Sequence, residues 1–207
     1  MARTPQRSPA ESKRRKRRRR IATVAVYMLM VFGLAWYFDS QATTTILLVR
    51  HADIDLAAGN GRNPPLNATG RARAELLADF LQDIDVVASV DAIYASEFVS
   101  TQQTAKPLAD RLGLPVNVED QYDADPFMEK VLAEHKGRIV LVVTHPDTLA
   151  PLVEALHGSK NVPEIAPDEY DNLYIVTVPW FAKVKTLRLR YGIGWRPPRE
   201  AGAYTLP

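Results

Sequence analysis

The sequence of 207 residues contains no cysteine. This absence excludes a disulfide framework, a thiolate nucleophile and a cysteine-based metal site. Histidine is also scarce, with four residues, and none of them forms the His-x-x-x-His spacing of a metal site. The carboxylates likewise show no spacing suited to a bound metal ion. We therefore expect neither a metal nor another cofactor.

Acidic residues are almost missing from the first twenty positions, which hold ten Lys or Arg residues and a single acid, Glu11. The rest of the chain holds 16 Lys or Arg and 23 Asp or Glu residues, a net charge of −7. A domain with an acidic field does not favour a polyanion, so we expect no nucleic-acid partner. Residues 1–20 are rich in Arg, Pro and Ser and lack apolar periodicity, which predicts a disordered tail.

Charge is absent from residues 21–38, an apolar stretch that ends in Trp36, Tyr37 and Phe38. Its length is near the lower limit for a membrane-spanning helix, and terminal aromatics are typical of the membrane interface. The preceding basic cluster predicts a single-pass anchor in the plasma (inner) membrane, with a cytoplasmic N-terminus and an extracytoplasmic domain. A cleaved signal peptide is the alternative, because residues 40–42 (SQA) resemble a small-x-small cleavage site.

The remainder reads as one α/β domain over residues 44–192, after a linker at 39–43 and before a Pro- and Gly-rich tail at 193–207. Apolar runs rich in β-forming residues alternate with amphipathic segments that have helical periodicity. This order predicts a three-layer α/β/α sandwich with a mostly parallel sheet.

Two of the fully apolar runs end in a histidine. Residues 46–49 (ILLV) lead into Arg50 and His51, and residues 139–144 (IVLVVT) lead into His145. Ligands bind at the carboxyl ends of central strands in open α/β sheets. If the two strands are neighbours, one cation and two imidazoles converge in a pocket for an anion, where a histidine can attack phosphorus.

Five segments resemble, in order, the signature segments of the histidine phosphatase superfamily, whose members have the phosphoglycerate-mutase-like fold. They are LVRHA at 48–52, PLNATGRARA at 65–74, IYAS at 93–96, QTA at 103–105 and VVTHPDT at 142–148. The resemblance covers nearly the whole domain. Each segment alone is weakly diagnostic, and the ordered set is specific.

The resemblance implies roles for individual residues. His51 would accept the phosphoryl group as a phosphohistidine, while Arg50 and His145 would bind its oxygens. A carboxylic acid would protonate the leaving alcohol, and its carboxylate would then activate water. Asp123 is the first candidate for this acid, and Asp125 and Asp147 are the alternatives.

Two positions depart from the family pattern. Ser100 stands where the family has a second phosphate-binding arginine, and Asp147 stands where it has an asparagine. The first change removes a charge-assisted hydrogen bond worth roughly 1.5–3 kcal/mol. Arg62, in the loop after the first strand, is a candidate replacement cation.

The sequence thus predicts a membrane-anchored phosphatase that hydrolyses the phosphomonoester of a phosphorylated small molecule or phosphoprotein. Ser100 and Asp147 also motivate an alternative, a catalytically weak or inactive phosphatase-like domain that serves as a binding or scaffold module.

Overall fold

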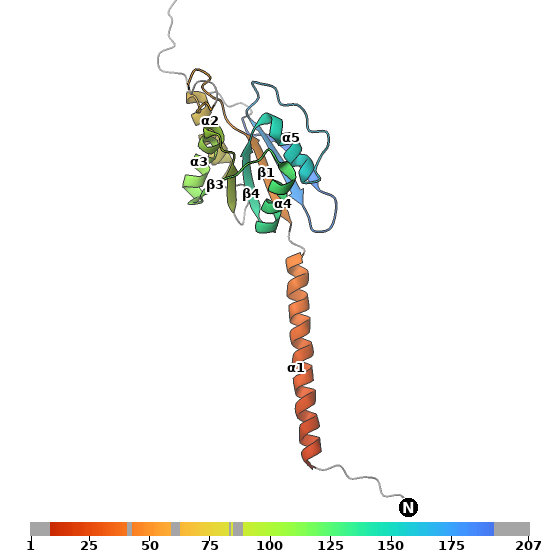
Figure 1. The fold of residues 1–207 in the computed structure, drawn as a ribbon. Coiled ribbons are helices and arrows are strands. Elements are labelled where there is room, and N and C mark those ends of the chain that lie inside the picture. Colours follow the sequence, from red (N-terminus) through yellow and green to blue (C-terminus); the bar gives the residue numbers. More distant parts are fainter. Residues whose placement is uncertain (1–8, 41–42, 59–62, 83, 85–88, 193–207) are drawn as a thin grey trace, which may run out of the picture. The chain divides into compact units, whose positions relative to one another are not determined.

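The computed structural model describes residues 9–40, 43–58, 63–82, 84 and 89–192 of the chain (Figure 1). The chain divides into two compact units, Met1–Ala42 and Thr43–Pro207. The boundary falls between the apolar N-terminal segment and the first strand.

The first unit contains one helix, α1 (Pro9–Ser40). Its stretch Lys16–Tyr37 is long and apolar enough to cross a membrane, and no part of it is buried against protein. A helix of this length and composition is compatible with either a membrane anchor or a signal sequence.

The start of α1 corrects one sequence prediction. Residues 9–20 are helical, although their composition predicted a disordered tail. Lys and Arg are good helix formers, and extending an existing helix avoids the cost of nucleating a new one. The apolar segment can therefore carry the helix back through the basic run.

The second unit is built on a six-stranded sheet with the strand order β3-β2-β4-β1-β5-β6. Four neighbouring strands, β3, β2, β4 and β1, are parallel, whereas β5 is antiparallel to β1 and β6 is antiparallel to β5. The mostly parallel sheet predicted from the sequence is confirmed. The strands are β1 (Thr44–Arg50), β2 (Ala92–Ala95), β3 (Val116–Val118), β4 (Ile139–Thr144), β5 (Asn172–Val178) and β6 (Lys185–Arg190).

Helices cover both faces of the sheet, which gives the predicted three-layer sandwich (Figure 1). Helices α4 (Ala124–Glu134) and α5 (Pro146–Ala155) pack on one face. Helices α2 (Ala68–Leu81) and α3 (Val99–Leu112) pack on the other. In β1, Ile46 and Leu48 face the first pair of helices, and Leu47 and Val49 face the second. Alternation of side chains along a strand explains why its whole apolar run is buried.

The start of α2 holds the loop that follows β1. Asn67 caps the helix by accepting a hydrogen bond from the Gly70 backbone N–H at 2.8 Å, and its own N–H donates to the Asp53 carbonyl at 3.1 Å. A Cβ at Gly70 would lie 2.0 Å from that same carbonyl oxygen. The glycine therefore allows the helix to approach the backbone two residues beyond His51.

The Gly70→Ala variant is predicted to lower the free energy of unfolding by about 1–3 kcal/mol, the usual cost of overpacking. Helix propensity alone predicts the opposite sign, because alanine is better than glycine inside a helix by roughly 1 kcal/mol. Urea unfolding of the two proteins measures the difference. A variant at least as stable as the natural chain would show that the approach of α2 to this loop is not tight.

Candidate active site

The two strand-end histidines lie side by side. Strands β1 and β4 pair in parallel, with Arg50 opposite Thr144, so His51 and His145 leave the same edge of the sheet. The centroids of their rings are 5.3 Å apart. The sheet thus brings together the two imidazoles and the Cα of Arg50, the last residue of β1.

The imidazole of His51 is buried, and its tautomer is fixed. Its Nδ1 lies 2.8 Å from the backbone carbonyl oxygen of Ala52. A carbonyl can only accept, so Nδ1 carries the proton and Nε2 keeps its lone pair. Burial is the main cause that lowers the pKa of His51 to about 4, and the nearby His145 and Arg50 add to the effect. His51 is therefore a neutral imidazole with an available nucleophilic nitrogen.

The backbone that holds His51 is itself held by α3. The Ala52 N–H donates to the Thr104 hydroxyl at 2.9 Å. That hydroxyl in turn donates to the Ser100 carbonyl at 2.7 Å. Thr104 therefore fixes the peptide whose carbonyl selects the His51 tautomer.

His145 sits at the N-terminus of α5 and is held by several contacts. Its Nε2 lies 2.9 Å from the Ser96 hydroxyl, which also lies 2.8 Å from the Thr101 hydroxyl. Its ring packs edge-on against Phe98, with centroids 4.7 Å apart. Burial lowers the pKa of His145, Asp147 opposes this shift, and Arg50 reinforces it. The ring is thus oriented by the short segment between β2 and α3, which supplies both Ser96 and Phe98.

The guanidinium of Arg50 is held by hydrogen bonds to the loop between α5 and β5. Its Nη1 donates to the carbonyls of Ala166, Pro167 and Glu169, each at 3.1 Å. Its Cζ lies 4.2 Å from the centre of the Tyr170 ring. Burial lowers the pKa of Arg50, and the nearby acidic groups oppose that shift, so the guanidinium keeps its charge.

The Nε of Arg50 is buried and has no hydrogen-bond partner among the described residues. An unsatisfied buried donor on a charged group is costly. Arg50 is therefore a buried cation whose hydrogen bonding is incomplete within the part of the chain that the structure describes.

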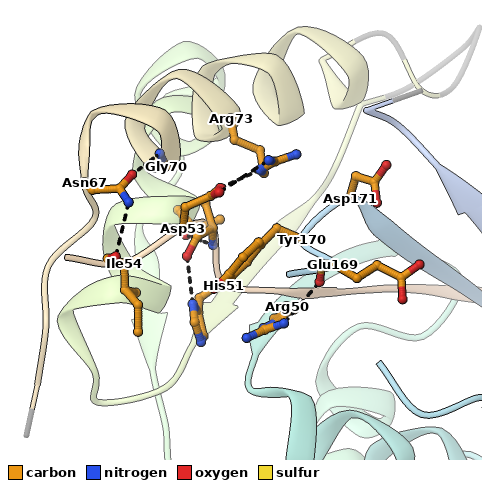
Figure 2. A network of polar contacts seen from close by, with 12 residues as sticks. Arg50, His51, Asp53, Ile54, Asn67, Gly70, Arg73, Glu169, Tyr170 and Asp171 are labelled. Atoms are coloured by element: carbon orange, nitrogen blue, oxygen red, sulfur yellow. Dashed lines mark hydrogen bonds and ion pairs between the residues drawn. The ribbon is translucent and has the colours of Figure 1, made fainter. Parts of the chain in front are cut away.

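A second arginine extends this network (Figure 2). Arg73, on α2, pairs with Asp53 through its Nε at 2.6 Å. The Tyr170 ring lies between the guanidinium groups of Arg50 and Arg73, and its centre is 5.8 Å from the Cζ of Arg73. The Tyr170 ring also lies 6.2 Å from the ring of His51. Tyr170 therefore connects the strand-end residues to α2.

A cavity of about 90 Å³ opens beside His145. Its carboxylate-bearing lining residues are Glu97 and Asp120, and the full lining is Ser96, Glu97, Phe98, Asp120, Gln121, Tyr122, His145 and Thr148. The Asp120 carboxylate is held by the Tyr122 N–H at 2.9 Å. Asp120, in the loop before α4, thus lines the same cavity as His145.

The acids named from the sequence do not line this cavity. Asp123 is the exposed residue that precedes α4. Asp147 lies in the first turn of α5, exposed, and lines a separate pocket with Glu164 and Ile165. The role of either residue in proton transfer stays a prediction.

The other two predicted site residues have different outcomes. Ser100 is buried in the first turn of α3, one helical turn before Thr104. Residues four apart share a helix face, so position 100 faces the loop that holds His51. Arg62 lies outside the described residues. Within the described parts of the chain, no group of three His, Asp or Glu side chains gathers as a metal site.

Three residues of the site were not identified from the sequence. Thr104 and Ser96 lie within two of the segments that resemble the family signature. The resemblance predicted that these segments matter, but it did not predict the hydrogen bonds that the two residues make. Tyr170 follows a long irregular stretch with no periodicity and no resemblance to mark it. Its position depends on the loop between α5 and β5.

Comparisons with known proteins agree with this architecture. A family model described as "Histidine phosphatase superfamily (branch 1)" matches residues 46–123. An uncharacterised protein of Mycobacterium tuberculosis, Rv0525, is 37% identical over 91 residues. That match covers 42% of this chain and 43% of the relative, so the two share less than half of their lengths.

Solved structures of phosphatases have the same fold. A mycobacterial glucosyl-3-phosphoglycerate phosphatase, Rv2419c, is 16% identical with a TM-score of 0.54, covering 72% of this chain and 98% of that one. A putative phosphohistidine phosphatase, SixA, from Agrobacterium tumefaciens is 22% identical with a TM-score of 0.55, covering 70% and 97%.

At these identities the structures show the fold, which is phosphoglycerate-mutase-like as predicted. Residues 46–123 are thus similar to the histidine phosphatase superfamily, and the solved phosphatases share the fold of the second unit.

The state of His51 can be measured directly by nitrogen NMR of the chain in detergent micelles. We expect a neutral ring with the proton on Nδ1 down to about pH 5, because the folded pKa is near 4 rather than the ordinary value of 6.5. The His51→Gln variant identifies the signals. A titration midpoint near 6.5, or a proton on Nε2 at neutral pH, would contradict this description of the site.

Proposed function

We propose that this protein is a membrane-anchored phosphatase that hydrolyses a phosphomonoester through a phosphohistidine on His51. In the first step, His51 Nε2 forms a bond to phosphorus while the bond from phosphorus to the ester oxygen breaks. A carboxylic acid gives its proton to the departing oxygen. Water then attacks the phosphohistidine, passes a proton to the carboxylate, and releases inorganic phosphate and free His51.

The observation that carries the proposal is the hydrogen bond from His51 Nδ1 to the Ala52 carbonyl. It leaves Nε2 unprotonated, and the low pKa of the ring keeps it so at neutral pH. A neutral imidazole is the form that can attack phosphorus. The carbonyl also stabilises the positive ring that forms during attack, because its oxygen faces the Nδ1–H.

Arg50 and His145 are proposed to bind the phosphoryl oxygens. Phosphoryl transfer asks a protein mainly for positioning and for charge stabilisation of the transferred group. Arg50 already has Nη1 anchored on three carbonyls, which fixes the position of its guanidinium. A preorganised cation of this kind loses little freedom when the phosphate binds.

The proton donor is proposed to come from the loop before α4. Asp123 was the first candidate from the sequence, while Asp120 is the loop carboxylate that lines the cavity beside His145. Asp120 is therefore the better-supported of the two. The donor matters most when the leaving group is a poor one, so an alkyl phosphate should be affected more than an aryl phosphate.

The substrate is proposed to be a phosphorylated small molecule or phosphoprotein on the far side of the membrane from the N-terminus. The apolar part of α1 suits a membrane anchor, and the basic residues before it suit a cytoplasmic N-terminus. A reporter enzyme fused after residue 207, active only outside the cytoplasm, tests this orientation.

A binding or scaffold module with little activity is the second candidate, and Ser100 is the observation that favours it. The residue is short, buried and uncharged at the position where the family pattern has a phosphate-binding arginine. Without an arginine at position 100, Arg50 is the main fixed cation beside His51 among the described residues.

Turnover of para-nitrophenyl phosphate by the reconstituted full chain tests the proposed activity. The His51→Ala variant should lose at least about a hundred-fold in kcat/KM, because it lacks the nucleophile. Asp120→Asn should lose more with an alkyl phosphate than with the aryl ester, and Asp123→Asn serves as the matched control. Equal rates for the natural chain and His51→Ala would sink the assignment of the nucleophile.

Restoring the missing arginine separates the two candidate functions. Ser100→Arg should raise kcat/KM for the same ester by about ten-fold or more, in line with one charge-assisted hydrogen bond. If Arg62 supplies the missing charge, Arg62→Ala should lower the activity of the natural chain and matter less beside Ser100→Arg. No gain in a normally folded Ser100→Arg variant would favour the binding module.

A further inference from the structure

The hairpin between β5 and β6 carries an unusual concentration of exposed apolar side chains. Trp180 and Phe181 at its tip are 55% and 82% exposed, and their rings lie together with centroids 6.3 Å apart. Leu187 and Leu189, on the edge strand β6, are also exposed. Two adjacent aromatic rings that are each more than half exposed indicate a surface that meets an apolar partner.

The backbone at the tip holds the aromatic pair outward. Ala182, directly after Phe181, has a φ of 140°, which residues other than glycine rarely adopt. Strained backbone persists where the surrounding structure fixes it, and it is enriched at segments that contact ligands. The tip is thus a defined conformation rather than an arbitrary turn.

The charge around this tip differs in sign from that of the rest of the domain. Lys183 and Lys185 flank the aromatic pair and are exposed. Lys160, also exposed, follows Ser159, whose N–H donates to the Thr186 hydroxyl at 3.0 Å. A group of lysines on an otherwise acidic domain, beside exposed Trp and Phe, suits the headgroup region of an anionic bilayer.

The strand register places this tip at the end of the sheet where the chain enters the domain. Val178, the last residue of β5, pairs with Thr44, the first residue of β1. Thr44 follows the last residue of α1, Ser40, by four positions, a chain length that spans at most about 14 Å. If α1 is anchored in a membrane, the hairpin tip is therefore tethered within reach of the surface.

We infer that the β5–β6 hairpin docks on the membrane surface, with Trp180 and Phe181 in the interface and Lys183 and Lys185 on anionic lipid headgroups. This inference rests on the anchoring part of the proposed function and not on the catalytic part. Continuity of the chain and complementarity of charge select lipid over a protein as the occupant.

Docking would also orient the active site. Strand β1 begins at Thr44 near the hairpin and ends at Arg50, six positions later and roughly 20 Å distant. His51 would then face away from the bilayer. The substrate class that this orientation admits is a soluble phosphomonoester rather than the headgroup of a lipid in the same membrane.

The absence of cysteine makes a direct test possible. The full chain, carrying either Phe181→Cys or Leu56→Cys, is labelled with a polarity-sensitive fluorophore and reconstituted in phosphatidylcholine vesicles with or without phosphatidylglycerol. Leu56 is the matched control, because it is 75% exposed and lies in the loop after the opposite end of β1. Some lipids carry a nitroxide quencher high on the acyl chain.

We expect several-fold stronger quenching at position 181 than at position 56, increased further by phosphatidylglycerol. Reversing the charges with Lys183→Glu and Lys185→Glu should remove the effect of the anionic lipid. Lys106→Glu should not, because Lys106 is an exposed residue of α3 outside the hairpin. Equal quenching at the two labelled positions would overturn the inference. A spectral shift at position 181 that persists in detergent and grows with protein concentration would overturn it in favour of a second copy of the chain.

Release of the chain by alkaline carbonate would instead overturn the membrane anchor. Quenching at position 181 would still report whether the hairpin meets lipid, and the phosphatase assay would be unaffected. The outcomes for docking, anchoring and catalysis are therefore distinguishable.

Discussion

The parallel pairing of β1 with β4 is the constraint on which the site depends. Because the two strands run side by side in register, their carboxyl ends deliver His51 and His145 to the same edge of the sheet. Both strands are buried on both faces between the two pairs of helices, so a change in their pairing would disrupt both core clusters. The hydrophobic core thus fixes the separation of the two imidazoles.

The chemistry then depends on a few hydrogen bonds made to that scaffold. The Ala52 carbonyl selects the tautomer of His51, Thr104 holds the Ala52 peptide, and the loop carbonyls after α5 hold Arg50. The last two of these contacts join the end of β1 to α3 and to the loop after α5. The low pKa of His51 follows from the resulting burial beside another imidazole and a cation. Positioning and nucleophilicity therefore have the same structural origin.

Much of this arrangement could be predicted from the sequence. The buried strands, their terminal histidines and the capping residue Asn67 all follow from local patterns that tertiary structure did not override. The role of Tyr170 could not be predicted, because it depends on where an irregular loop folds back. Nor could the position of Asp120 beside His145, since the acidic loop offers several carboxylates and only tertiary packing chooses among them. The helical basic run was mispredicted because composition alone ignores extension from a neighbouring helix.

The central claim is that His51 carries the phosphoryl group during turnover. Brief incubation of the reconstituted chain with a radiolabelled phosphomonoester, followed by quenching in base and peptide mapping, measures this directly. The account predicts an acid-labile, base-stable label on the peptide that contains His51, and no label in His51→Gln. A label on His145, or continued turnover without any labelled histidine, would contradict it.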